Sequence, residues 1–127
     1  MSAPGSDKHL PQAAPIEAYG NGGFRFAGMS HRGSLLCLPD GIWAWPAASV
    51  DDVTEQALAP VFDRANAIDI FLLGCGIDLV PMPATLRERF RSLDISADPM
   101  STGAAVRTWN ILLAEGRRVA AGLIAVD

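Results

Sequence analysis

Long apolar runs and clustered metal ligands are both missing from this sequence. Nowhere do about 18 apolar residues follow one another, so the sequence predicts no helix that spans a bilayer. The only cysteines, Cys37 and Cys75, stand far apart, and the two histidines belong to no cysteine pattern. Without ligands at the spacing that zinc sites use, the sequence predicts no metal site.

Clusters of basic residues are missing as well. The 127-residue chain carries a formal net charge of −4, and its longest run of Lys or Arg is the pair Arg117-Arg118. Proteins bind nucleic acid mainly by neutralising phosphates, so this composition argues against nucleic acid as a partner. The first 23 residues have neither the apolar segment of a secretory signal nor the arginine content of a mitochondrial presequence. We therefore expect a cytoplasmic protein.

The composition indicates one domain preceded by a tail. Half of the residues are hydrophobic and 19% are charged, which is enough to bury a sizeable core without disulfides or metals. Residues 1–18 are rich in proline, alanine and serine, a composition typical of flexible segments. We expect these residues to form a flexible tail and residues 19–127 to form a single α/β domain.

An alternation of apolar and polar residues predicts an antiparallel hairpin near the start of that domain. Phe24 and Phe26 are separated by one residue, as on the buried face of a strand. Residues 30–33 indicate a turn and residues 34–38 a second strand. The expected hairpin therefore spans residues 24–38.

A third short strand is expected at residues 42–45. Trp43 and Trp45 then point to the same face, because side chains alternate along a strand. Two tryptophans on one face either form a wall that holds a ligand or pack against a neighbouring helix. We favour packing, and the sequence leaves the ligand wall open.

The remainder of the chain alternates helices with strands. Such alternation predicts a mainly parallel sheet with right-handed crossovers, to which the hairpin adds antiparallel strands. The last helix is expected to start where Asp98-Pro99 resembles an N-cap followed by a proline in the first turn. The expected helices are residues 54–66, 83–92 and 99–115, and Pro60 either starts or interrupts the first of them. The expected strands are residues 68–73, 93–96 and 118–126.

Gly74, Cys75 and Gly76 follow the strand expected at residues 68–73, at the edge where open α/β sheets bind ligands. Two glycines there would let backbone N–H groups approach an anion. The loop has neither the glycine spacing of a dinucleotide fingerprint nor the lysine of a phosphate loop, so we expect no bound cofactor. Neither histidine is placed to activate the Cys75 thiol, and a tight structural turn is the alternative interpretation.

The expected C-terminal helix has two different faces. One apolar stripe should pack on the sheet and comprises Ala105, Val106, Trp109, Leu112 and Leu113. Arg107 and Asn110 lie on the opposite side, where they could bind a ligand or partner. The alternatives are an ordinary exposed arginine and an asparagine that holds a neighbouring loop. Glu115 and Arg118 are expected to pair across the turn that follows the helix.

The sequence resembles one known family in three stretches: Tyr19 followed by GGF, the strand FLLGCG, and the segment TGAAVRTWNILLAEGRRVAAGLI. This small α/β family contains the mitochondrial NADH:ubiquinone oxidoreductase complex assembly factor 3, and the resemblance covers residues 19–124. It implies a three-layer sandwich with a mixed central sheet, in which an N-terminal antiparallel hairpin precedes β-α-β-α-β units. The mitochondrial member is not known as an enzyme and helps assemble respiratory complex I at the inner membrane. Bacterial members, among which we place this chain, are largely uncharacterised.

Two functional hypotheses follow. In the first, the chain is a non-enzymatic interaction domain whose partner is another protein and which assists assembly of a respiratory or membrane protein complex. Peripheral membrane association and homo-oligomers are compatible with it. In the second, the chain is a small-molecule or anion-binding protein or an enzyme that uses the Gly74-Cys75-Gly76 loop with Arg107 and Asn110. The scarcity of catalytic groups favours the first hypothesis and predicts no catalytic residue.

Overall fold

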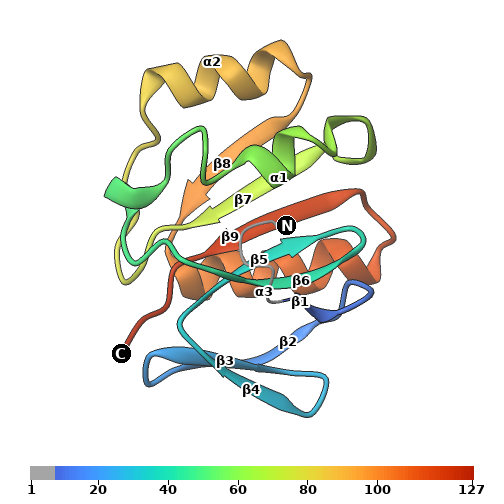
Figure 1. The fold of residues 1–127 in the computed structure, drawn as a ribbon, viewed down its shortest axis with the longest axis vertical. Helices are drawn as coiled ribbons and strands as arrows, with labels where there is room; N and C mark the ends of the chain where they lie inside the picture. The colour runs from blue at the N-terminus through green and yellow to red at the C-terminus, as the bar shows by residue number, and fades with distance from the viewer. Residues whose placement is uncertain (1–7) are drawn as a thin grey trace.

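A six-stranded sheet forms the centre of the molecule in the computed structural model, which describes residues 8–127 (Figure 1). The strand order is β1 (Lys8–Leu10), β6 (Gly41–Trp45), β5 (Ser34–Leu38), β9 (Val119–Leu123), β7 (Ile70–Gly74) and β8 (Ser96–Met100). β7 pairs parallel with β8 and β9, whereas β5 pairs antiparallel with β6 and β9. The central sheet is therefore mixed, which confirms the expected fold class.

Two outer layers cover the faces of this sheet. One contains helices α1 (Ala59–Phe62) and α2 (Ala84–Ser92), with short 3-10 turns at Val50–Asp52 and Ala65–Ala67. The other contains α3 (Thr102–Ala114) and a three-stranded antiparallel sheet of β2 (Ile16–Gly20), β3 (Gly23–Phe26) and β4 (Met29–Arg32). Each layer buries its own apolar cluster against the central sheet, so the molecule has one cluster on either side of it.

The two most apolar strands occupy the middle of the central sheet, as their sequences predict. β7 lies between β8 and β9, and β9 lies between β7 and β5. Every residue of β9 and the last four residues of β7 are buried. Strands that are covered on both faces need apolar side chains at every position, which explains why neither strand shows an alternating pattern.

The helices follow the sequence pattern where no proline interrupts it. α2 begins after Pro83 and ends at Ser92, as expected. α1 is a single turn that begins with Pro60 in its first turn, and residues 55–58 form turns before it. In α3 the apolar stripe faces the core, and Trp109 has no exposed surface.

The two tryptophans of β6 are packed rather than open to a ligand. Trp43 and Trp45 are both buried in the cluster beneath α1 and α2. The indole N–H of Trp45 donates to the carbonyl oxygen of Ala57 at 3.1 Å. The guanidinium of Arg64 lies 5.1 Å from the centre of the Trp43 ring. These contacts confirm the packing interpretation.

An antiparallel hairpin lies near the N-terminus, but its turn is at residues 27–28 and not at residues 30–33. β3 pairs with β4, whereas β5 pairs with β6 and β9. Ala27 and Gly28 have φ angles of 50° and 74°, the left-handed conformation of two-residue hairpin turns that glycine favours. The expected span of residues 24–38 is therefore wrong, because Gly28 belongs to a turn and not to the first strand.

Helix α3 begins at Thr102 and not at Pro99. Asp98 and Pro99 lie in β8, which is an edge strand and tolerates a proline on its unpaired side. The residue that caps the helix is Ser101, whose hydroxyl accepts a hydrogen bond from the N–H of Ala104 at 3.3 Å. The sequence offers two possible N-caps three residues apart, Asp98 and Ser101. The expected strand at residues 93–96 is wrong for the same reason, because β8 spans Ser96–Met100 and includes Asp98 and Pro99.

Residues 8–18 contain more regular structure than the expected tail. β1 extends the central sheet at the edge of β6, and the expected boundary at Tyr19 falls inside β2. Leu10 and Ala14 pack against the core around α3. A proline-rich and alanine-rich composition is equally suited to an extended segment that crosses a sheet, so it does not identify a tail. Residues 1–7 lie outside the described residues.

Arg118 pairs with Asp69 and not with Glu115. Nη2 and Nε of Arg118 lie 2.7 Å and 3.0 Å from the two carboxylate oxygens of Asp69, and Nη1 donates to the carbonyl oxygen of Asn66. This arginine lowers the pKa of the Asp69 carboxyl. The two residues precede neighbouring parallel strands, β9 and β7, so strand pairing brings them together from distant parts of the sequence.

Candidate functional site

The Gly74-Cys75-Gly76 segment lies at the end of β7 and is hydrogen-bonded to the start of α3. The Cys75 N–H donates to the carbonyl oxygen of Met100 at 2.7 Å. The Gly76 N–H donates to the hydroxyl oxygen of Thr102 at 3.0 Å, and the Gly76 carbonyl accepts from the Thr102 N–H at 2.8 Å. Gly76 has a φ of 107°, which favours glycine. Both N–H groups are thus engaged within the protein, which supports the tight-turn interpretation.

The Cys75 side chain is buried beside this loop. Its sulfur lies 3.5 Å and 3.4 Å from the carbonyl oxygens of Leu73 and Val80, which are acceptors and not bases. The second thiol, that of Cys37, lies in β5, and burial raises its pKa. A buried thiol whose pKa is raised stays protonated and is a poor nucleophile. This argument applies to Cys37, whereas for Cys75 the observation is that its sulfur contacts carbonyl oxygens and no base.

Substitution Cys75→Thr is expected to leave both stability and function near those of the wild type. Threonine keeps a small side chain, and its hydroxyl can donate to the same carbonyl oxygens. We expect a change in the free energy of unfolding below about 1.5 kcal/mol. Urea denaturation of the purified variant, together with complementation in the native organism, measures both. A well-folded Cys75→Thr protein that fails to complement would favour a catalytic thiol.

Asn110 holds β2 against α3. Its side-chain oxygen accepts from the N–H of Ile16 at 2.8 Å, and its side-chain nitrogen donates to the carbonyl oxygen of Ile16 at 2.9 Å. One amide thus satisfies both backbone groups of a residue in an edge strand. Asn110 therefore holds a neighbouring segment, as in the alternative to ligand binding. Its side-chain amide has little hydrogen-bonding capacity left for a ligand.

Arg107 is exposed on α3, one turn after Gly103. The Tyr19 ring lies over Gly103, so the side chains of Tyr19 and Arg107 emerge from neighbouring parts of the surface. The start of α3 at Thr102 and the position of Asn110 are about 12 Å apart along the helix axis. The candidate residues therefore lie on α3 or beside its first turn. A hollow on the three-stranded sheet and another beside α2 are both lined by other residues.

An apolar loop follows Gly76, and sequence reasoning missed it. Ile77, Leu79 and Val80 are 78%, 57% and 40% exposed. Loops are normally polar, so three large apolar residues within four positions of a loop require an explanation. The sequence signal was present, because this apolar run stands between Gly76 and Pro81 without the period of a helix or a strand.

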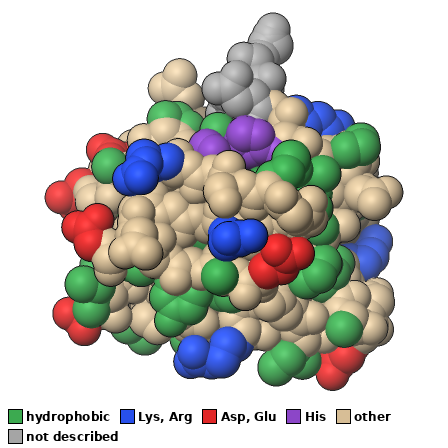
Figure 2. All heavy atoms as spheres, turned by 90° about the horizontal axis from the view of Figure 1, so that it is seen from below, with side chains coloured by type: hydrophobic (Ala, Val, Ile, Leu, Met, Phe, Trp, Pro, Cys, Tyr) green, Lys and Arg blue, Asp and Glu red, His purple; other side chains and the backbone are tan. Residues whose placement is uncertain are grey.

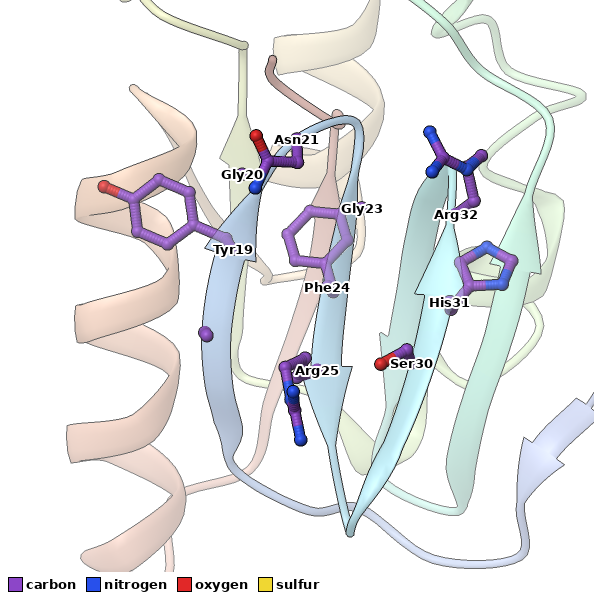
Figure 3. Close-up of a pocket in the computed structure, with 10 residues that line it drawn as sticks. Tyr19, Gly20, Asn21, Gly23, Phe24, Arg25, Ser30, His31 and Arg32 are labelled. Carbon is purple, nitrogen blue, oxygen red and sulfur yellow. The ribbon is translucent and has the colours of Figure 1, made fainter.

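The outer face of the three-stranded sheet contains a hollow of about 400 Å³, which sequence reasoning also missed. The labelled residues in Figure 3 come from all three strands and from the turn between β2 and β3. Arg25, Ser30 and Arg32 contribute polar side chains, and Gly20 and Gly23 leave the backbone bare. The alternating polar residues of β3 and β4 could have indicated this face. With the turn expected at residues 30–33, however, Ser30 and Arg32 do not lie on a strand beside Arg25.

The metal-ligating side chains are dispersed. Between Lys8 and Asp127, no three or more His, Cys, Asp or Glu side chains are placed to hold a metal ion. His9 Nε2 lies 3.0 Å from His31 Nδ1, and His31 Nε2 lies 3.2 Å from the carbonyl oxygen of Ser34. In this same part of the chain no helix has the length and apolarity that crossing a membrane requires.

Known proteins resemble the chain over most of its length. An uncharacterised protein from Rhodobacter capsulatus is 41% identical over 88% of this chain and 85% of its own length. The NADH dehydrogenase [ubiquinone] 1 alpha subcomplex assembly factor 3 of Mus musculus is 29% identical over 91% of this chain. This chain spans only 62% of that mouse protein.

A solved structure and a family model agree with these matches. The crystal structure of an outer membrane protein from Bartonella henselae is 50% identical, with a TM-score of 0.90, and covers 94% of this chain and 100% of its own. A family model matches residues 16–124, which include every predicted site residue. The chain belongs to the family of proteins of unknown function described as DUF498/DUF598.

Proposed function

We propose that this chain is a non-enzymatic interaction domain that assists assembly of the respiratory NADH:ubiquinone oxidoreductase complex. The name of the mouse relative supports this role. The internal engagement of the Gly74–Gly76 loop and of Asn110 also supports it, because these groups have little capacity left for a small ligand. The single observation that carries the proposal is the exposed apolar loop after Gly76.

The proposed partner surface lies around the first turn of α3. The loop contributes Ile77, Leu79 and Val80, and β2 contributes Tyr19, which is 44% exposed. Gly76 is hydrogen-bonded to Thr102 and Tyr19 covers Gly103, so the loop and Tyr19 flank that turn. Arg107 follows one turn later. We call these five residues, Tyr19, Ile77, Leu79, Val80 and Arg107, the α3-end surface.

The chemistry of the α3-end surface suits a protein partner. Interface centres are enriched in apolar, aromatic and arginine side chains, and this surface combines all three kinds. An isolated exposed apolar residue needs no explanation, whereas several in one loop are typical of an interaction site. Covering them with a partner removes apolar area from water, which stabilises the complex.

The same proposal places the protein in the cytoplasm, with contact to a membrane arising through its partner. Fractionation of native cells tests this placement. We expect the protein in the soluble fraction when the complex is absent and partly with the membrane fraction while the complex is being built. Recovery in the outer membrane fraction would contradict the cytoplasmic placement and leave the interaction surface to be tested separately.

The decisive experiment is deletion of the gene in the native organism, followed by complementation. We expect deletion to lower the amount of assembled NADH:ubiquinone oxidoreductase complex on native gels of membranes. The double variant Ile77→Ser with Leu79→Ser should fail to restore it, because a partner contact with each side chain is lost. Both side chains are exposed, so the free energy of unfolding should change by only about 0.5 kcal/mol per site.

Met29→Ser is the matched control. Met29 is also an exposed apolar residue, but it lies at the tip of the β3–β4 hairpin, in the three-stranded sheet. We expect this variant to restore the complex fully. Normal complex levels in the deletion strain would refute the assembly role, and equal failure of both variants would show that the loop has no special part in it.

A further inference from the structure

The outer face of the three-stranded sheet carries two arginines as diagonal neighbours. In the pairing of β3 with β4, Arg25 lies opposite Ser30, and Gly23 lies opposite Arg32. Side chains at alternate positions share a face, so Arg25 and Arg32 project on the same side of the sheet. Both are exposed, and Figure 2 shows basic side chains spread over the molecule as seen from this side.

Among the described residues, neither arginine forms an ion pair with a carboxylate. Four other arginines form ion pairs with carboxylates, namely Arg64, Arg89, Arg91 and Arg118. Within residues 8–127, Arg25 and Arg32 form no ion pair and no side-chain hydrogen bond. Asp127, which lies near Arg32 at the rim formed by Gly22, does not pair with it. Arg25 and Arg32 are thus two neighbouring cations on one face of a chain whose formal net charge is −4.

The space between the two arginines suits carboxylates of an extended chain. Both arginines line the hollow of about 400 Å³, together with the small side chain of Ser30 and the larger side chains of Tyr19, Asn21, Phe24 and His31 (Figure 3). Small-molecule sites are mostly enclosed and apolar. This one lies on the outer face of a sheet, where Arg25, Ser30 and Arg32 supply polar and basic groups beside the rings of Tyr19 and Phe24. Guanidinium groups bind carboxylates through two parallel N–H···O bonds, which fixes the orientation of an acidic side chain.

We infer that this face binds an extended acidic segment of the protein partner, with Arg25 and Arg32 each holding a carboxylate and Ser30 donating a hydrogen bond between them. The inference rests on the proposed function in one respect, namely that the acidic segment belongs to a protein partner. It adds a second, electrostatic contact to the apolar contact made by the α3-end surface. Because charges on an open face are screened by ions, the contact should weaken as salt is added.

Fluorescence anisotropy of a labelled hexaglutamate peptide, titrated with the full chain at low salt, tests this inference. The double variant Arg25→Gln with Arg32→Gln should bind the peptide about tenfold or more weakly, because two charge-assisted contacts are removed. Arg87→Gln with Arg117→Gln is the matched control, since both residues are exposed arginines and the net charge changes equally. The control should bind within about twofold of wild type. A hexaglutamine peptide should not bind.

Several results would overturn the inference. Equal loss of binding in the control would show a general effect of net charge. Competition by inorganic phosphate at the concentration of peptide carboxylates would assign the face to a small anion. A dimer that the Arg25→Gln and Arg32→Gln changes dissociate would assign it to a second copy of the chain. If peptide binding fails while the Ile77 and Leu79 variant still blocks complex assembly, the proposed function stands and only this inference is lost.

Discussion

Replacing Trp109 with alanine should lower the free energy of unfolding by about 3–5 kcal/mol. The side chain has no exposed surface and packs with residues of β2, β3 and the central sheet. The change removes its contacts and leaves a cavity between these layers. It also removes the indole N–H that donates to the carbonyl oxygen of Ala14 at 3.0 Å. Loss of this size is a large part of the stability of a domain of this length.

Ile111→Ala is the control for this prediction, because Ile111 lies on the same helix and is 58% exposed. We expect it to change the free energy of unfolding by about 0.5 kcal/mol or less. Urea denaturation followed by circular dichroism compares the two variants under the same conditions. Equal stability of both would show that the buried stripe of α3 has been assigned to the wrong side.

Features that depend on local periodicity could be predicted from the sequence. The apolar stripe that includes Trp109 repeats at the helical period, which predicts that this face of the helix is buried. β7 and β9 are continuous apolar runs, which predicts that both faces of each strand are buried. The position of α2 also follows from a local signal, since Pro83 stands directly before its first turn. These elements required no knowledge of what lies beside them.

Features that depend on a choice between similar local signals could not be predicted. Gly28 and Gly33 both mark possible turns, and only the pairing of β3 with β4 shows that the hairpin closes at Gly28. Asp98 and Ser101 are both good N-caps, and the parallel pairing of β8 with β7 decides for Ser101. In each case both positions suit the turn or the N-cap about equally well, and a tertiary contact decides which of them is used.

The candidate site was harder to predict than the fold, because its residues are defined by what they contact. Asn110 was correctly placed on the polar side of α3, but only the structure shows that Ile16 occupies both of its hydrogen-bonding groups. The glycines at positions 74 and 76 were expected at the end of a strand, where they indeed lie. What the sequence could not show is that Thr102 binds the Gly76 N–H.

Thr102→Val should lower the free energy of unfolding by about 2–4 kcal/mol, since the buried Ile124 carbonyl and the half-buried Gly76 N–H each lose a partner. The Thr102 hydroxyl donates to the carbonyl oxygen of Ile124 at 2.7 Å and accepts from the Gly76 N–H at 3.0 Å. Thr102 has no exposed surface, so water cannot easily replace the hydroxyl. Valine keeps the shape of the side chain, which isolates the effect of the two hydrogen bonds.

Thr108→Val is the matched control within the same helix, because the Thr108 hydroxyl donates only to the carbonyl oxygen of Ala104 in the preceding turn. We expect this control to lose less than about 1 kcal/mol in urea denaturation, since the Ala104 carbonyl also belongs to the helix ladder. If Thr102→Val is as stable as the control, the Gly76 N–H does not depend on Thr102. That N–H would then be available to an anion, and the small-ligand hypothesis for the Gly74–Gly76 loop would regain its main support.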